Sequence, residues 1–551
     1  MAIFKRTGIH GLVAGAALAS AAVAGATTAR ADDCMQLAAN FHRPNTTITL
    51  AQTVPAGTFV PPAPPIEIIP GLPVAGPVSL PGLPQFCRIA GFTTPTSDSH
   101  IQFELWIPST SWNLKYLQVG CGGLCGSISY TSMADPLIRG YAVAATDDGH
   151  EAGAGDASFA VGHPEKVIDF GYRSLKETTD VSKELVLAFE RSAPQRSYFL
   201  GCSDGGREAL MEAQRFPLDF DGIVAGSPAN FWTHLFTGFL WNQVAQQSLP
   251  GAFLAQADMD TMSAAALAQC VGRDGGLSTD AFLNYPPACR FNPRTLPLSQ
   301  DTVTAIERIF SGPPGIFPGY RLGEGEANVL LNWPAWISGD GIIPPGGGQG
   351  LLADAYFQDI VFPNSGWTPN TFSAAENARQ ADLRTGAILN SIDPDLHPFK
   401  LRGGKLIQYV GWSDSAISPR NDINYYTAVT DVMGGPQDTE DFYRMFMVPG
   451  MAHCGGGPGA NAFGNGANGP NPSDPADDVL SALDHWVVDG AAPDEIVATK
   501  YVNDDPTQGI AFQRPLCTFP KISKYTGQGS TTVASSFACV RPDDIGELAG
   551  N

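Results

Sequence analysis

Two short segments of this sequence contain residue types that could carry out nucleophilic catalysis. Ser203 lies within Gly201-Cys-Ser-Asp-Gly205, and glycines on both sides of a serine allow the sharp turn that exposes its hydroxyl as a nucleophile. Much later in the chain, His453 enters a glycine-rich stretch, and an imidazole is a common general base for a serine hydroxyl. The neighbours Cys202 and Cys454 could join the two groups through one disulfide bond.

A third catalytic group, an acid, is expected between this serine and this histidine in the chain. The best candidate is Asp414, because it follows the apolar run 405–411 and therefore lies just beyond the end of a predicted strand. A carboxylate there would orient the imidazole and stabilise its cationic form. Taken singly, the histidine could be an ordinary loop residue and the aspartate a helix cap. Together, their order Ser, Asp, His in the chain and the predicted strand before each of them favour a catalytic triad.

Two sets of backbone amides could stabilise the oxyanion of such a reaction. A helix is predicted directly after Ser203, and its first amides, beginning with that of Asp204, would point at the serine. The glycine-rich segment 120–126 follows another predicted strand. We expect the second donor there, at Gly123 or, as the second choice, Gly122. The segment lacks both the Lys-Ser/Thr of a phosphate-binding loop and the glycine spacing of a dinucleotide site.

The residues around these candidates predict an α/β fold. Strand-like runs at 102–107, 114–119, 141–146, 197–200 and 222–225 alternate with helical segments such as 167–190, which is typical of a parallel sheet. This alternation stops after 228 and returns after 403, with a further helix at 476–489. We therefore predict a catalytic domain formed by residues 32–228 and 403–551, with residues 229–402 inserted into it as a lid domain.

Three of these motifs resemble the tannase and feruloyl esterase family, which includes the bacterial hydrolase of mono(2-hydroxyethyl) terephthalate. They are Gly201-Cys-Ser-Asp-Gly-Gly206, Gly411-Trp-Ser-Asp414 and Pro449-Gly-Met-Ala-His-Cys-Gly-Gly-Gly457. The resemblance covers nearly the whole chain after its N-terminal segment. It implies an α/β-hydrolase core with a large inserted lid, and hydrolysis of esters of aromatic acids.

The cysteine count and the N-terminus indicate an oxidising compartment. Residues 1–31 combine Lys5-Arg6, an alanine-rich apolar stretch and Ala29-Arg-Ala31, so we expect a signal peptide and a secreted or periplasmic protein. Ten cysteines are an even number, and their dispersal without a C-x-x-C pair disfavours zinc. The family resemblance implies four disulfide bonds and leaves two cysteines for a fifth. These pairs are Cys202–Cys454, Cys34–Cys87, Cys270–Cys289 and Cys517–Cys539, followed by Cys121–Cys125.

The predicted lid domain contains candidates for binding an aromatic group and for binding a metal. Aromatic side chains stack on planar groups, although they more often form the core; the candidates for substrate binding are Trp333, Trp336, Trp367 and Phe372. Relatives carry a lid loop that resembles a calcium site, but here two of its three carboxylate positions are Val271 and Ser278. Because calcium prefers six to eight oxygen ligands, we expect Asp274 and Asp280 to support a turn, with a weak calcium site as the alternative, and we expect no cofactor to be required.

Charge and composition restrict the partners and the function. The formal net charge of −22 becomes −25 once the three cationic residues Lys5, Arg6 and Arg30 are removed with the signal peptide. This charge disfavours nucleic acids and anionic membranes, and no later stretch is apolar enough for a membrane helix. We expect a secreted serine carboxylesterase acting on small esters of phenolic acids such as gallate or ferulate. The alternatives are a polysaccharide acyl esterase, a terephthalate monoester hydrolase or, from another class, a catalytically silent binding module on this fold.

Overall fold

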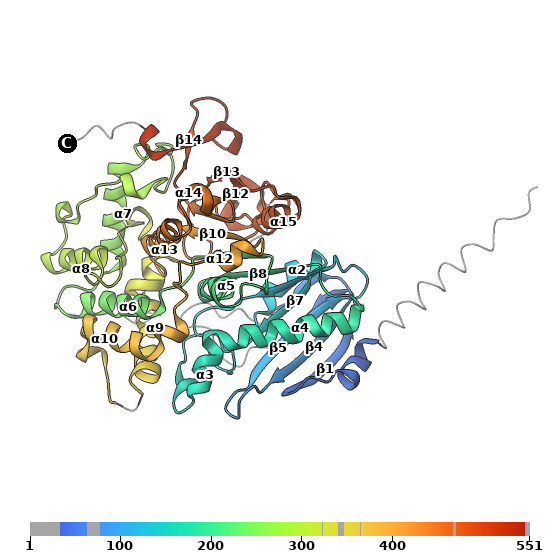
Figure 1. Ribbon diagram of the computed structural model, residues 1–551. Coiled ribbons are helices and arrows are strands. Elements are labelled where there is room, and N and C mark those ends of the chain that lie inside the picture. The colour runs from blue at the N-terminus through green and yellow to red at the C-terminus, as the bar shows by residue number, and fades with distance from the viewer. Residues whose placement is uncertain are drawn as a thin grey trace, which may run out of the picture.

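A large mixed β-sheet forms the centre of the protein in the computed structural model (Figure 1). The structure describes residues 33–62, 78–321, 323–339, 346–363, 365–466 and 470–545, so the predicted signal peptide lies outside the described residues. Within them, nine strands pair in the order β1-β4-β5-β7-β6-β8-β9-β10-β11. Their bounds are β1 Thr46–Val54, β4 Phe86–Thr93, β5 Ile101–Pro108, β6 Lys115–Val119, β7 Ala142–Thr146, β8 Arg196–Cys202, β9 Gly222–Gly226, β10 Lys405–Gly411 and β11 Tyr443–Val448.

The strands from β7 to β11 in this order are parallel to one another. All residues of β7 and β9 are buried, as expected for parallel strands that have helices on both faces. Three helices cover one face, namely α4 (Ser174–Glu190), α5 (Asp204–Arg215) and α13 (Pro419–Val432). The other face packs against α2 (Tyr130–Ile138) and α15 (Val479–Asp489). The carboxyl ends of β8, β10 and β11 therefore lie at one edge of the sheet, where Ser203, Asp414 and His453 follow.

The other side of the sheet is antiparallel. The strand-like run 102–107, which is strand β5, was predicted to be parallel to its neighbours, and this prediction is wrong. Strand β5 pairs antiparallel with both β4 and β7. The segments 94–100 and 109–114, which flank β5, are short and contain no helix. A parallel connection needs a crossover of a dozen residues or more, whereas antiparallel strands can be joined by a short loop.

A helical insertion separates β9 from β10 (Figure 1, green to yellow). We call residues 229–402 the insertion; its described residues contain helices and no strand. The main helices are α6 (Trp232–Gln247), α7 (Gln256–Cys270), α8 (Gln300–Ser311), α9 (Gly347–Ala355) and α10 (Ala374–Ala381), followed by the shorter α11 (Ala387–Leu389) and α12 (His397–Leu401). Its description as a separate lid domain stays a prediction.

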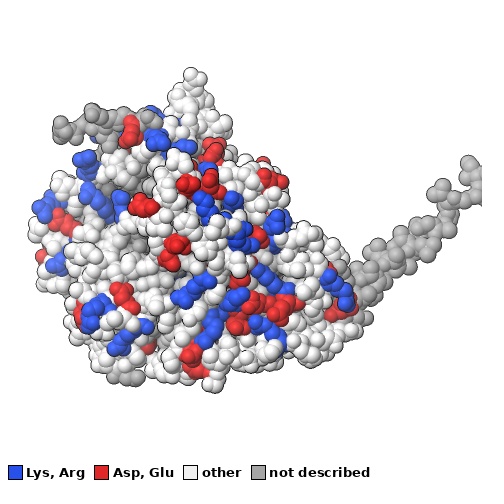
Figure 2. All heavy atoms as spheres, in the orientation of Figure 1, with Lys and Arg blue, Asp and Glu red and all other residues white. Residues whose placement is uncertain are grey.

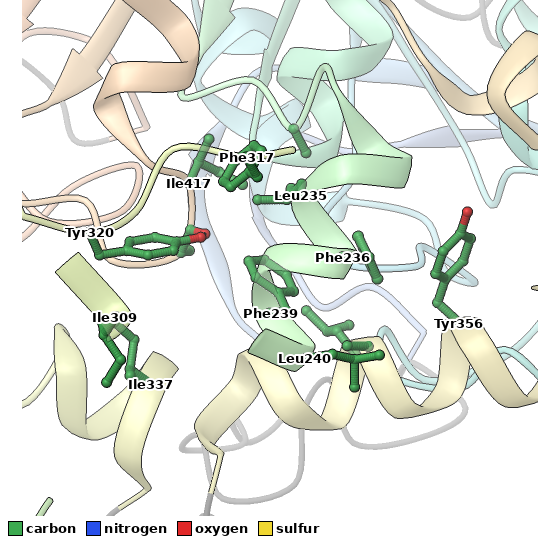
Figure 3. Close-up of a cluster of buried hydrophobic side chains, with 14 of the residues drawn as sticks. Leu235, Phe236, Phe239, Leu240, Ile309, Phe317, Tyr320, Ile337, Tyr356 and Ile417 are labelled. Carbon is green, nitrogen blue, oxygen red and sulfur yellow. The ribbon is translucent and has the colours of Figure 1, made fainter. Parts of the chain in front are cut away.

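The hydrophobic core of the insertion extends into the loops at the edge of the sheet. Helix α6 contributes Leu235, Phe236, Phe239 and Leu240 to this core (Figure 3). The same cluster includes Ile417, which follows Asp414 by three residues, and Leu124 of the glycine-rich segment. Because protein cores are close-packed, the insertion holds both loops in place.

All ten cysteines are paired, and the pairs are the five named above. This pairing is consistent with an oxidising compartment. Among the described residues, no helix has both the length and the apolar character needed to cross a membrane. Cationic and anionic side chains are interleaved on the face shown in Figure 2. Arg43, for example, pairs with Glu177 and Asp180 of α4. The expected lack of nucleic-acid binding stays a prediction.

Candidate active site

Ser203 occupies a strained turn between β8 and α5. Its backbone angles are φ 66° and ψ −120°, a conformation that non-glycine residues rarely adopt and that recurs at nucleophilic serines. The turn brings backbones too close for side chains: a Cβ at Gly201 would lie 2.2 Å from the carbonyl oxygen of Gly205, and one at Gly206 would lie 2.3 Å from that of Gly226. Glycines at both positions therefore allow the serine to project from the edge of the sheet.

The structure brings Ser203, His453 and Asp414 into one chain of hydrogen bonds. The imidazole Nε2 of His453 lies 2.8 Å from Ser203 Oγ, and its Nδ1 lies 2.8 Å from Asp414 Oδ2. The other carboxylate oxygen of Asp414 accepts hydrogen bonds from the amides of Ala416 and Ile417. With Asp414 buried and held in this way, Nδ1–H donates to the carboxylate, and Nε2 can accept the serine proton.

The disulfide bond between Cys202 and Cys454 joins the loops that carry the serine and the histidine. The two Cα atoms are 6.0 Å apart, across a sequence separation of 252 residues. The loop of His453 is also held by Asn465, whose side-chain amide donates to the carbonyl oxygen of Cys454 at 3.0 Å. The disulfide bond therefore limits how far Ser203 and His453 can move apart.

The glycine-rich segment lies against the start of α5, where an oxyanion would form. The amide of Gly205 donates to the carbonyl oxygen of Cys121 at 2.9 Å. Gly123 has φ +63°, and a Cβ there would lie 2.5 Å from the carbonyl oxygen of Ala154. Within the described residues, the amides of Gly122, Gly123 and Asp204 donate to no protein group, so they are available to a ligand. Which of them bind the oxyanion stays a prediction.

A buried cluster of carboxyl groups, which no local sequence pattern indicates, adjoins this segment. Oxygens of Asp148, Asp204 and Glu208 lie within 4.8 Å of one another and of the two sulfurs of Cys121–Cys125. This donor set does not fit a metal ion, because the sulfurs are bonded to each other and the guanidinium of Arg207 already bonds Asp204. The cluster is therefore a charge network inside the protein.

Comparisons with known proteins decide the family. A family model described as tannase and feruloyl esterase matches residues 87–311 and 350–540. An uncharacterized esterase of Xanthomonas campestris pv. campestris is 41% identical over 530 residues, which cover 90% of this chain and 89% of the relative. The chain belongs to the tannase and feruloyl esterase family.

Other relatives and solved structures support this membership and the fold. A probable feruloyl esterase B-1 of Neosartorya fischeri is 30% identical, over 95% of this chain and 98% of its own. The crystal structure of feruloyl esterase B from Aspergillus oryzae has a TM-score of 0.82 at 28% identity, covering 93% and 100% of the two chains. Tannin acyl hydrolase from Aspergillus niger has a TM-score of 0.69 at 20% identity, with coverages of 95% and 97%, and indicates the fold alone. The predicted α/β-hydrolase fold and carboxylic ester hydrolase class are thus confirmed.

Of the four aromatic residues predicted to bind substrate, the structure places only Trp336 against the triad. Its ring centroid lies 5.1 Å from that of His453 in an edge-to-face contact. Trp333 is 1% exposed and packs against Phe310. Trp367 stacks on Phe357, and Phe372 packs against the core of the insertion. These three rings pack within the insertion, and their contact with substrate stays a prediction.

The loop that resembles a calcium site does not suit a calcium ion. Asp274 and Asp280 are its only acidic residues, and each of their four carboxylate oxygens already accepts a hydrogen bond within the protein. The donors are the amides of Gly276, Leu277, Asn284 and Tyr285 and the guanidinium of Arg514. Arg514 lies 3.0 Å from Asp280 and supplies positive charge there. Calcium would have to displace these donors to reach its usual six to eight oxygens.

Removal of calcium should therefore leave this protein unchanged. After dialysis against EDTA, we expect the melting temperature to stay within about 1 °C of its value before treatment. A tightly bound calcium ion would add several kcal/mol to the free energy of unfolding by mass action, so its removal would lower the melting temperature by more than this. Differential scanning calorimetry of the same sample before and after addition of calcium measures this. A melting temperature that falls with EDTA and returns with calcium would contradict the interpretation that Arg514 supplies the positive charge beside Asp280 in place of calcium.

One buried residue next to the loop of Asp414 was not found from the sequence. Glu326 of the insertion accepts hydrogen bonds from the hydroxyl of Ser413 at 3.0 Å and from the amide of Leu283. Burial raises the pKa of Glu326 to about 7. Ser413 directly precedes Asp414, so Glu326 ties the insertion to the loop of the acid. Its distance of 87 residues from Ser413 in the chain leaves no local signal.

Proposed function

We propose that this chain hydrolyses esters of aromatic, phenolic acids through an acyl-enzyme formed on Ser203. The observation that carries this proposal is the chain of hydrogen bonds from Ser203 through His453 to Asp414, at 2.8 Å for each link. Side chains in this arrangement activate a serine hydroxyl, with the histidine as base and the carboxylate as its partner. Membership in the tannase and feruloyl esterase family supports esters of phenolic acids as the substrate class.

The reaction would have two steps. Ser203 Oγ attacks the ester carbonyl carbon while His453 Nε2 takes its proton, and the amides of Asp204 and of Gly123 or Gly122 stabilise the oxyanion. Collapse of this intermediate breaks the ester C–O bond, and His453 gives its proton to the departing alcohol. Water then attacks the acyl-enzyme with His453 again acting as base. This second step releases the aromatic acid and restores Ser203.

An apolar wall beside His453 supports an aromatic acyl group. The indole ring of Trp336 contacts the imidazole edge-to-face, and Gly348 leaves it room, because a Cβ there would lie 3.0 Å from the ring. Leu331, which is 47% exposed, lies beside the His453 loop: its Cδ1 would be 3.0 Å from a Cβ at Gly456. Aromatic rings stack favourably on such surfaces.

A panel of esters tests the substrate class directly. We would compare kcat/KM for methyl ferulate, methyl gallate, chlorogenate, a terephthalate monoester and an acetyl ester such as p-nitrophenyl acetate. We expect one of the phenolic acid esters to be the best substrate. A higher value for the terephthalate monoester, or hydrolysis of the acetyl ester alone, would place the protein in another class of esterase.

Truncation of Trp336 should selectively impair aromatic substrates. We expect Trp336→Ala to lower kcat/KM for the best aromatic ester about tenfold, because one aromatic contact contributes about 1 to 1.5 kcal/mol. The kcat/KM for the acetyl ester should change by less than about threefold. Trp367→Ala is the matched control, because its ring stacks within the insertion on Phe357 and Phe362. Equal losses on both substrates would show that Trp336 supports the structure and not the acyl group.

The compartment is part of this proposal. We infer that the protein acts outside the cytoplasm, because its five disulfide bonds require an oxidising environment to form and persist. N-terminal sequencing of the protein recovered from the medium or periplasm would locate the cleavage site, which we expect after Ala31.

A further inference from the structure

Helix α5 bonds both peptide units that flank the Cα atom of Cys121. In the Gly120–Cys121 unit, the N–H of Cys121 donates to Glu208 Oε2 at 3.3 Å. In the Cys121–Gly122 unit, the carbonyl oxygen of Cys121 accepts from the amide of Gly205 at 2.9 Å. Gly122 and Gly123, the candidate oxyanion donors, follow directly in the chain. The bond from Gly205 therefore fixes the unit that carries the N–H of Gly122, and the side chain of Glu208 supports it by holding the preceding unit.

Glu208 is 1% exposed and belongs to the cluster of three carboxyl groups described above. Asp204 is paired with Arg207, whose guanidinium also donates to the carbonyl oxygens of Phe170 and Gly171. Among the described residues, Arg207 is the one cation that faces the cluster. Asp148 accepts from the hydroxyl of Ser174 at 3.0 Å. Since one cation balances one carboxylate, Asp148 and Glu208 cannot both stay ionised side by side without a large cost.

A shared proton resolves this conflict. Carboxyl oxygens of Glu208 and Asp148 lie within 4.8 Å of each other, and two carboxyl groups can hydrogen-bond only when one of them keeps its proton. Burial raises the pKa of Asp148 to about 7 and raises the pKa of Glu208 well above its ordinary value. In its neutral form the carboxyl of Glu208 can donate to Asp148 and still accept from the N–H of Cys121.

We propose that Glu208 is a positioning residue for the oxyanion hole, which it holds through the Cys121 peptide in its proton-bearing form. This inference rests on the proposed function, because it concerns the oxyanion of an ester bound at Ser203. Glu208 touches neither substrate nor the reacting atoms. It acts by fixing the Gly120–Cys121 peptide unit, which precedes the units that carry the N–H groups of Gly122 and Gly123. The Cys121–Cys125 bond closes the same short loop.

The proposal predicts a loss of activity at alkaline pH. A group whose pKa is raised by folding favours the native arrangement while it is protonated, and this contribution is lost as the pH rises through that pKa. Ionised Glu208 would face Asp148 and Asp204 with only Arg207 between them, so the carboxylates would separate and release the Cys121 peptide. We expect kcat of the native protein to fall on the alkaline side, with little change in KM.

Two substitutions of Glu208 test this role. Glutamine reproduces both hydrogen bonds and cannot ionise; we expect Glu208→Gln to keep kcat within about threefold at pH 7 and to lose the alkaline decline. Alanine removes the support, and we expect Glu208→Ala to lower kcat about tenfold to a hundredfold with KM changed less than twofold, since a small misplacement of oxyanion donors has effects of this size. Kinetics from pH 5 to 10 with one ester measure both variants.

Glu212 provides the matched control. It lies one turn further along α5 and is buried, and neither of its carboxylate oxygens has a hydrogen-bond partner within the described residues. Glu212→Gln should therefore show the kcat and pH profile of the native protein. If Glu208→Ala does not fold, the pH profile of Glu208→Gln decides. A Glu208→Gln profile that falls in parallel with the native one, or a Glu208→Ala protein with native kcat, overturns the inference.

Failure of this inference is distinguishable from failure of the proposed function. If Ser203→Ala is inactive while the Glu208 variants behave like the native protein, then only the positioning role is wrong. If Ser203→Ala keeps its turnover, the proposed site itself is wrong whatever the Glu208 variants do.

Discussion

Replacement of Ser203 by alanine is expected to lower kcat by about 10⁴-fold or more. The hydroxyl is the atom that His453 Nε2 faces at 2.8 Å, and without it no acyl-enzyme forms. Removal of a nucleophile of this type leaves only the catalysis due to substrate binding and oxyanion stabilisation. KM should change little, because the glycine-rich segment 120–126 and Trp336 remain in place. Steady-state kinetics with the best ester of the panel, on purified protein of native melting temperature, measure both constants.

Covalent labelling provides an independent measurement of the same residue. A fluorophosphonate should add one adduct to the native protein, located at Ser203 by peptide mass analysis, and none to Ser203→Ala. Ser415→Ala is a suitable control, because Ser415 lies next to Asp414 and its buried hydroxyl has no hydrogen-bond partner within the described residues. If the native protein resists the label and hydrolyses no ester, it is instead a catalytically silent binding module on this fold.

The elements next to the catalytic candidates could be predicted because their signals are local. The strand before Ser203, the glycines around it and the helix after it are contiguous in sequence, and only glycine fits where Gly201 faces Gly205. The same holds for Asp414, which follows a continuous apolar strand. Their convergence at one edge of the sheet then follows from the parallel strands, since residues after parallel strands meet at the same edge.

Features that depend on contacts between distant segments could not be predicted. Strand β5 is an exception, because the short segment 109–114 that joins it to β6 already indicates an antiparallel direction. Trp333 and Trp336 are three residues apart in one segment, yet the first is 1% exposed in the core and the second touches His453. Glu208 sits on a helix that is buried on nearly all sides, and its partner Asp148 comes from a loop 60 residues earlier. No pattern within either segment indicates a shared proton.

Removal of the disulfide bond between Cys202 and Cys454 should reduce both stability and turnover. In the chain-entropy description, closing a loop across 252 residues contributes about 5 kcal/mol, as an upper value, to the free energy of unfolding. The bond also fixes the spacing of Ser203 and His453, and a shift of about 1 Å in such a pair can lower the rate about a hundredfold. We expect the Cys202→Ala/Cys454→Ala protein to melt well below the native protein and to lose about tenfold to a hundredfold in kcat.

The loss of turnover must be separated from the loss of stability, and another disulfide bond of the same chain allows this. Cys517–Cys539 spans 22 residues, contributes about 3 kcal/mol in the same description, and joins no catalytic residue. Cys517→Ala/Cys539→Ala should therefore lose stability while keeping kcat, when both are measured at least about 15 °C below the lower melting temperature. If the Cys202 and Cys454 double variant also kept its kcat there, the bond would stabilise the fold alone, because the hydrogen bonds of Asp414 and Asn465 would suffice to place His453.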